Sequence, residues 1–213
     1  MNRKTTVYEK EEQLLSSLRT AWKEEWAYEN READGAEIVG EEFDTLSVNR
    51  CRFSHCTFSD CNFSHTSFTD VTFCGCDLSN SDFSDAYFSN CGFENCKLLG
   101  TRFNDSVQYG VYFSECNMTL ASFSESKLDG TEWCGCLMRD AVLSACSMKK
   151  TVLRRCVLQG CSFFHTSLSG MNLTENELDG IILSEGLKEL RGAVLSNEQC
   201  TVLAHLLGIR VQS

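Results

Sequence analysis

The sequence predicts an all-β solenoid that is closed at each end by an α-helix. Apolar residues recur at every fifth position from Phe43 to Leu183, which makes 29 positions without a shift of frame, and among them only Gln108 is polar. A period of five fits neither a helix nor a flat strand, and an internal repeat of this length decides the fold. Proline is absent from the 213 residues, as suits a structure of continuous backbone ladders.

Each repeat contains a second position that should point inward, two residues before the apolar centre. It holds a small residue, and the residue after the centre is often Ser, as the stretch CRFSHCTFSDCNFSHTSF at 51–68 shows. This pattern resembles the pentapeptide-repeat family, whose unit is small, polar, Leu or Phe, Ser/Thr/Arg and any residue. The resemblance covers about two-thirds of the chain. It implies a right-handed quadrilateral parallel β-helix with four units per coil, which gives about seven coils here.

Residues twenty apart should then stack on one inner wall. Two columns are almost wholly aromatic: Phe63, Phe83, Phe103 and Phe123 in one, and Phe53, Phe73, Phe93, Phe113 and Trp133 in the other. Each buried ring should contribute about 1.5–3 kcal/mol. Gln108 interrupts a third column, so we expect residues 106–110 to bulge or bend the coil.

Eleven of the fourteen cysteines fall on the small inward position. Six of them form one column: Cys56, Cys76, Cys96, Cys116, Cys136 and Cys156. A disulfide ladder and a metal array are conceivable, but neighbours in register point the same way and cannot converge on a tetrahedral metal ion. We expect reduced core thiols, which are typical of a cytoplasmic protein, with no metal and no cofactor.

Residues 1–40 are expected to form an N-terminal cap. Thr6 and Glu9 have the spacing of a capping box, and the helix that they begin should end near Asp34. Its apolar residues at helical spacing are Leu15, Leu18, Trp22 and Trp26. Two roles remain open: a lid whose tryptophans pack on the first coil, and a helix that binds a partner.

The β-helix is predicted to occupy residues 41–190, and a C-terminal helix and strand residues 191–213. Ser196 and Gln199 form a second capping box, and Gly208 suits the end of the helix. This tail resembles that of the Qnr-type quinolone-resistance proteins, and the resemblance implies a homodimer through it. A monomer capped by its own helix is the alternative. The expected dimer-interface residues are Leu195, Val202, Leu203, Leu206, Leu207, Ile209 and Val211.

The net charge of −11 argues against a protein that binds nucleic acid or an anionic membrane, and no long apolar run or signal segment is present. Residues 43–138 hold 12 acids and 5 bases, whereas residues 139–185 hold 5 of each. Asp85, Asp105 and Glu125 share one outer column, with Asp82 beside it. Stacked like charges repel, so the column is either a solvated face or a surface that presents phosphate-like charge.

The Qnr-type resemblance implies a non-enzymatic DNA mimic that binds a type II topoisomerase, DNA gyrase or topoisomerase IV, and limits its poisoning by quinolones. Two features depart from that pattern. The frame carries no interrupting loop, and positive charge lies toward the expected dimer end, at Arg139, Lys149, Lys150, Arg154 and Arg155. The alternative is an adaptor whose partner docks on the N-terminal helix. An enzyme is the weakest hypothesis, because no catalytic constellation stands out and His55, His65 and His165 fall at outward corners.

Overall fold

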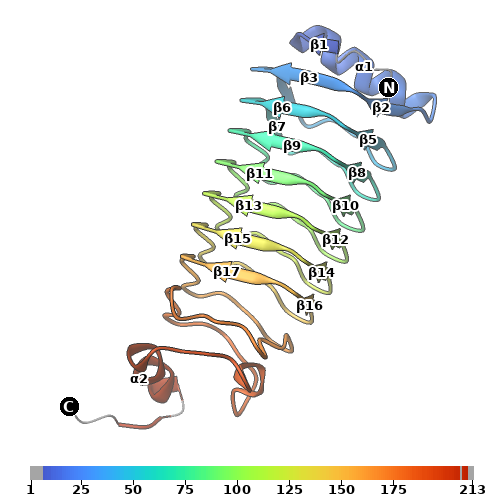
Figure 1. Ribbon diagram of the computed structural model, residues 1–213. Coiled ribbons are helices and arrows are strands. Elements are labelled where there is room, and N and C mark those ends of the chain that lie inside the picture. The colour runs from blue at the N-terminus through green and yellow to red at the C-terminus, as the bar shows by residue number, and fades with distance from the viewer. Residues whose placement is uncertain (1–6, 207, 211–213) are drawn as a thin grey trace, which may run out of the picture.

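The computed structural model, which describes the backbone of residues 7–206 and 208–210, confirms the parallel β-solenoid. The chain winds into a four-sided rod with a helix at each end (Figure 1). One coil takes 20 residues, so that Phe53 pairs with Phe73 and Phe73 with Phe93. Two of every five side chains are buried, the apolar centre and the small residue two positions before it.

Two sides of the rod are continuous parallel sheets of three- and four-residue strands. Face 1 is a seven-stranded sheet of β2 (Ala27–Glu29), β5 (Ser47–Asn49), β8 (Ser67–Thr69), β10 (Tyr87–Ser89), β12 (Val107–Tyr109), β14 (Lys127–Asp129) and β16 (Ser147–Lys149). Face 2 is an eight-stranded sheet of β1 (Val7–Glu9), β3 (Arg31–Asp34), β6 (Arg52–Ser54), β9 (Thr72–Cys74), β11 (Gly92–Glu94), β13 (Tyr112–Ser114), β15 (Glu132–Cys134) and β17 (Val152–Arg154).

The other two sides are held mainly by single bridges. Face 3 begins with β4 (Glu37–Val39) paired to β7 (Thr57–Ser59) and continues by bridges as far as Val157 with Glu177. Face 4 consists of bridges alone, from Glu42 with Asn62 to Ser162 with Ile182. The chain therefore turns four corners in each coil, which accounts for the repeat of five.

Stacked rings fill the core as the register predicts. Phe63 lies 5.2 Å from Phe83, Phe103 lies 4.8 Å from Phe123, and Phe113 stacks on Trp133 at 5.7 Å between ring centroids. Rings of adjacent columns meet edge to face, an arrangement that adds about 0.5–1.5 kcal/mol per pair to their burial. The cysteine column is also buried. From Cys76 onward each of its thiols donates to a backbone carbonyl of the preceding coil, as Cys96 does to Phe73 at 3.4 Å, whereas Cys56 donates to Ser54 in its own coil.

The expected bulge at residues 106–110 is wrong. Strand β12 pairs in register with β10 and β14, and Gln108 simply takes the place of a Phe or Leu in the column. Its side chain is fully buried, and its Nε2 donates to Ser106 Oγ at 3.2 Å. The Oε1 atom has no partner. The ladder of backbone hydrogen bonds outweighs the cost of one poorly satisfied amide.

The N-terminal boundary also needs correction. Helix α1 spans Glu11–Lys23 with Lys10 at its N-cap, so it neither starts at Thr6, which lies outside the described residues, nor reaches Asp34. Strands β2, β3 and β4 already belong to the solenoid, which therefore starts well before residue 41. Their centres are Tyr28, Ala33 and Ile38, which the Phe/Leu pattern did not reveal.

Glu9, expected in a capping box, is instead fully buried beneath α1. Its carboxylate accepts from Tyr28 Oη at 2.6 Å and from Ser17 Oγ at 2.8 Å, and it lies 3.3 Å from Arg31. Burial, then the bond to Glu9, raises the pKa of Tyr28. The network ties β1, α1, β2 and β3 into one end cap.

Helix α2, Asn197–Leu206, closes the other end. The predicted capping box is confirmed: the amide of Gln199 donates to Ser196 Oγ at 3.2 Å, and the amide of Ser196 donates to Gln199 Oε1 at 2.8 Å. Gln199 Nε2 also donates to the carbonyls of Leu173 and Asn176 in the last coil. A short 3₁₀ helix, η1 (Lys188–Leu190), precedes α2.

Candidate partner-binding surface

The corners of the rod have one backbone conformation that the sequence analysis missed. The residue two places after each centre has a positive φ at corner after corner, with values such as 58° at Asp85 and 57° at Asp105. Glycine, Asn and Asp tolerate this left-handed conformation best, which explains how often they occupy the position. The "any residue" position of the repeat is therefore constrained, and its side chain is displayed at the edge of the rod.

We name Asp85, Asp105 and Glu125 the acidic corner. All three are exposed corner residues on consecutive coils between faces 4 and 1, as the register predicts. Their backbone amides donate to the next coil, to Asn104, Ser124 and Ser144, at 2.8–2.9 Å. The ladder thus fixes their backbone spacing along the rod at about 4.8 Å, compared with an axial rise of about 3.4 Å per phosphate of one DNA strand.

Asp82 lies beside the acidic corner but is not a free charge. Its carboxylate pairs with Arg102 at 2.9 Å and accepts from the amide of Ser84 at 2.9 Å. Partial burial opposes ionisation, but the bonds from Ser84 and Arg102 outweigh it and hold the pKa of Asp82 below its usual range. The side chain therefore serves to join two coils, as Asp77 does with Lys97 at 2.9 Å.

Most other acids of the rod remain unneutralised. Of the twelve acids in residues 43–138, a segment described throughout, Asp77 and Asp82 are the two in ion pairs. Several of the rest occupy other corners, namely Asp60, Asp70 and Glu115. The acidic corner is thus the place where three unpaired carboxylates follow one another in register.

The residues expected at a dimer interface differ in how far they are buried within their own chain. Leu203 is 5 % exposed and belongs to the core of its own chain, so it is not a free interface residue. Leu195 and Val202 are partly buried, and Ile209 is 52 % exposed. Leu207 and Val211 lie outside the described residues, as does the side chain of Leu206.

The apolar residues of the N-terminal segment also differ in burial. Leu14, Leu18 and Ala21 pack on the first coil, and Trp22 donates from Nε1 to the carbonyl of Asp44 at 2.9 Å. Trp26 lies beyond the end of the helix and is 65 % exposed. The helix is therefore a lid, and of the two tryptophans expected to pack on the coil only Trp22 does so.

Three exposed tyrosines, two of them in contact, were not singled out by the sequence analysis. Tyr87 and Tyr109 on face 1 have ring centroids 5.9 Å apart. Tyr112 on face 2 donates to Glu94 at 2.6 Å, and burial, then this bond, raises its pKa to about 12. The signal was available, because all three occupy outward positions of the register.

Within the part of the chain that the structure describes, no group of three or more His, Cys, Asp or Glu is placed to hold a metal ion. Over the same residues, no helix has both the length and the apolar character needed to span a bilayer. Burial raises the pKa of inward thiols, for example that of Cys91 to about 11.

Comparisons with known proteins agree with this architecture. The profile described as "Pentapeptide repeat region" matches residues 86–163, and that of "Pentapeptide repeats (8 copies)" matches residues 49–85 and 66–105. A search of curated protein sequences finds no significant match.

The solved structures that the chain resembles are distant in sequence. HetL, a pentapeptide repeat protein involved in heterocyst differentiation regulation in the cyanobacterium Nostoc sp. strain PCC 7120, is 14 % identical, with a TM-score of 0.56 over 86 % of this chain and 91 % of that one. Full-length QnrB1, a plasmid-mediated fluoroquinolone resistance protein, is 20 % identical, with a TM-score of 0.48 over 84 % of this chain and 100 % of that one.

Proposed function

Since the chain belongs to the pentapeptide-repeat proteins, we propose that it acts without catalysis, as a DNA mimic that binds a type II topoisomerase, DNA gyrase or topoisomerase IV. The acidic corner is the observation that carries the proposal. It presents three unpaired carboxylates in register on a rigid rod, as a regular line of negative charge like that of DNA phosphates. Protection of the enzyme from quinolones is the expected consequence.

Electrostatics favours this kind of partner. An enzyme that binds DNA offers a positively charged groove, and complementary charge raises the rate of encounter and selects the partner. The stacked aromatic core holds the carboxylates in fixed positions, so little conformational entropy is lost on binding. The repulsion among three neighbouring carboxylates is tolerable on such a scaffold and is relieved when a cationic surface covers them.

Dimerisation through the C-terminal segment is part of the proposal. Two rods joined at the α2 end would bring two acidic corners into one molecule, with the basic residues of the C-terminal coils between them. Because Leu203 packs within its own chain, we assign the contact to the expected interface residues that remain outside the core, among them the exposed Ile209.

A supercoiling assay tests the proposed function directly. DNA gyrase would be assayed with and without ciprofloxacin, in the presence of increasing amounts of the protein. We expect inhibition of supercoiling at high protein concentration, and partial recovery of activity in the presence of the drug at lower concentration. An unchanged gyrase activity in both arms would reject the proposal.

One observation favours the alternative of an adaptor. Trp26 is a large exposed side chain at the N-terminal end, with a hollow of about 280 Å³ on one side and a second of about 380 Å³ on the other. Exposed tryptophans beside hollows are frequent anchors in protein interfaces. Under this hypothesis Trp26→Ala abolishes partner binding, whereas neutralising the acidic corner leaves it intact.

A further inference from the structure

The basic residues near the C-terminal end surround a break in the solenoid wall. Strands β16 and β17 are the last strands of their sheets, although the chain makes another coil after them, with Leu168, Leu173 and Leu178 buried. On faces 3 and 4 that coil is bridged to the one before it, by Val157 with Glu177 and Ser162 with Ile182. Among the described residues, faces 1 and 2 have no such bridge at this level.

The backbone hydrogen bonds show where the wall opens. One coil earlier, the amide of Gly130 donates to Lys149 and that of Gly135 to Arg154. The equivalent amides of Lys150 and Arg155 make no backbone bond of this kind to the following coil, within the described chain. The carbonyl of Thr151 likewise lacks the bond that Thr131 receives from Val152. Donors and acceptors along β17 are therefore available to another strand.

Two features accompany the opening. Residues 168–173 keep their bonds to the following segment, Gly170 donating to Gly192 at 3.0 Å and Leu173 to Val194 at 2.9 Å, but lack those to the preceding coil. Asn176 stands where the cysteine column would continue, and its longer amide bridges the carbonyl of Leu153 and the amide of Cys156 at 3.0 and 2.9 Å. The longer side chain of Asn176 fits coils that stand apart on faces 1 and 2.

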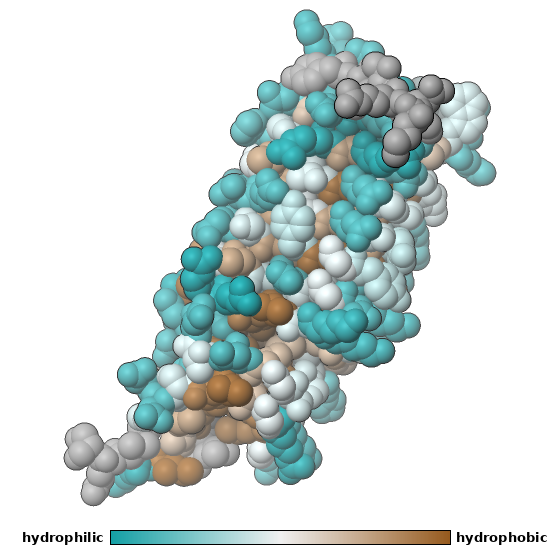
Figure 2. All heavy atoms as spheres, viewed as in Figure 1, coloured by the Kyte–Doolittle hydropathy of each residue, from teal (hydrophilic) through white to brown (hydrophobic). Residues whose placement is uncertain are grey.

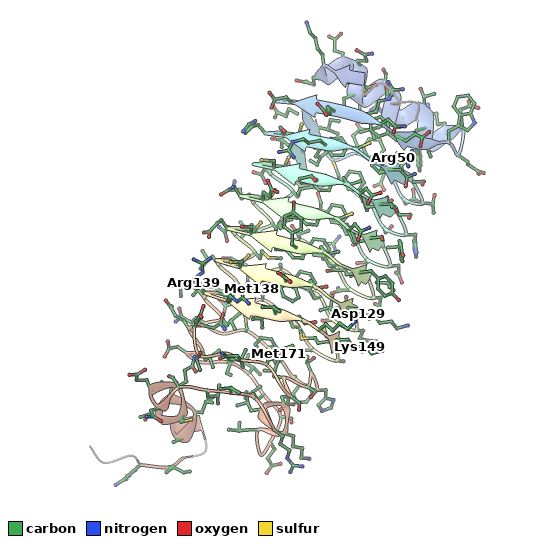
Figure 3. The ribbon with its side chains drawn as sticks, in the orientation of Figure 1. Arg50, Asp129, Met138, Arg139, Lys149 and Met171 are labelled. Atoms are coloured by element: carbon green, nitrogen blue, oxygen red, sulfur yellow. The ribbon has the colours of Figure 1, made fainter. Side chains whose placement is uncertain are left out.

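A pocket of about 220 Å³ lies in this opening. Thr151–Arg154 form one lip, and Gly170–Asn172 with Glu175 form the other. Met171 is only partly buried and lies below β17 (Figure 3). On the side of the rod that Figure 2 shows, apolar residues gather toward this C-terminal half. The opening thus combines an unpaired strand edge with a partly apolar wall.

The coil that carries the open edge is locally basic. Lys149, Lys150, Arg154 and Arg155 on it are exposed. Acids lie among them: Asp129 pairs in register with Lys149 and Glu132 with Val152, Glu175 lies on the opposite lip, and Glu115 and Glu175 interact with Arg155. Four like charges on one edge repel a second copy of the same edge, so the occupant should be a different, acidic molecule.

We propose that the open edge of β17 binds an extended acidic peptide segment of a partner protein by strand addition. The peptide backbone pairs with the free groups at Thr151 and Arg155. Since side chains alternate along a strand, its acidic side chains face Arg154 and the neighbouring bases, while the residues between them face Met171 and the pocket. This site is separate from the acidic corner and from the proposed topoisomerase contact.

The test is a fluorescence-anisotropy titration of the full-length protein against a fluorescein-labelled peptide of alternating Val and Glu, flanked by Ser. Three control peptides are used: one with Gln in place of Glu, one of scrambled order, and one with N-methylated alternate amides that keeps the charge but cannot pair. We expect saturable binding of the acidic peptide, with at least about tenfold weaker binding of the Gln and N-methylated peptides.

Protein variants locate the site. Arg154→Gln should weaken binding several-fold, whereas Arg139→Gln should not, because Arg139 is an exposed base that follows face 3 one coil earlier and does not line the pocket. Asn176→Cys, which restores the cysteine column, should close the wall, abolish peptide binding and raise the melting temperature. Equal binding of the N-methylated peptide, or equal losses in the two Arg variants, would reduce the interaction to unspecific charge attraction and overturn the proposal. Absence of binding by the acidic peptide would overturn it as well.

Discussion

At the scale of single residues, the solenoid shows how much a repeated backbone tolerates. Gln108 occupies a fully buried column position between Phe88 and Leu128, yet the strand keeps its register. An unpartnered carbonyl oxygen in such a place costs about 1–3 kcal/mol. The ladder absorbs that cost because every coil is held by both of its neighbours.

Replacing Gln108 by Leu should therefore stabilise the protein. The substitution removes the unsatisfied amide and keeps nearly the same volume, so we expect the free energy of unfolding to rise by about 1–3 kcal/mol. Urea unfolding followed by circular dichroism measures the change. Gln159→Leu, at an exposed position, is the matched control and should change it by less than about 0.5 kcal/mol. A destabilised Gln108→Leu variant would show that the amide has an unseen partner in the core.

At the scale of elements, the two ends are held differently from the middle. The coils in between repeat one hydrogen-bond pattern, whereas each cap depends on particular polar contacts. Glu9 joins β1, α1 and the first strands, and Gln199 joins α2 to the carbonyls of Leu173 and Asn176. Loss of either contact exposes an open sheet end, where unpaired edges favour aggregation.

The N-terminal cap can be tested by Tyr28→Phe. This change removes the hydroxyl that donates to the buried Glu9 carboxylate and nothing else, so we expect a loss of about 1.5–3 kcal/mol. The exposed Tyr87→Phe serves as the control, with a change below about 0.5 kcal/mol. Hydrogen exchange should show faster exchange confined to residues 7–34 in the Tyr28 variant. Equal stability of both variants would mean that Glu9 is not held through Tyr28.

The C-terminal cap separates folding from dimerisation. Leu203→Asp should destabilise the end of the rod, because it places a charge within the core. Ile209→Asp should leave the melting temperature unchanged and shift the mass measured by light scattering from dimer to monomer. A wild-type protein that is monomeric at all concentrations would contradict the proposed dimer.

The period-five pattern predicted the strands from β5 onward, the two aromatic columns and the burial of the cysteines, because each depends only on which side chains point inward. It missed β2, β3 and β4, whose centres include Tyr28 and Ala33, and it placed the end of α1 too late. The ion pair of Asp82 with Arg102 and the role of Leu203 in the core could not be foreseen. Both depend on side-chain conformation and on how α2 docks, which the repeat does not encode.

At the scale of the whole molecule, the rod carries two surfaces of opposite character. The acidic corner lies along the middle coils. The exposed bases Lys149, Lys150, Arg154 and Arg155 lie beside the opening near the C-terminal end. Unpaired acids on the other corners make the overall charge strongly negative without placing three in one register column. If charge mimicry is the function, the arrangement of the carboxylates should matter more than their number.

The measurement that tests this claim most directly is a competition assay, in which the protein displaces labelled DNA from DNA gyrase. The variant Asp85→Asn, Asp105→Asn, Glu125→Gln is compared with Asp60→Asn, Asp70→Asn, Glu115→Gln, which removes the same charge from other corners. We expect the acidic-corner variant to need at least about tenfold more protein for displacement, with an undiminished melting temperature because a like-charge stack is relieved. The control variant should stay close to wild type, and wild-type displacement should weaken from 50 to 200 mM salt. Displacement that is equal for all three proteins, or reduced equally in both variants, would contradict the account.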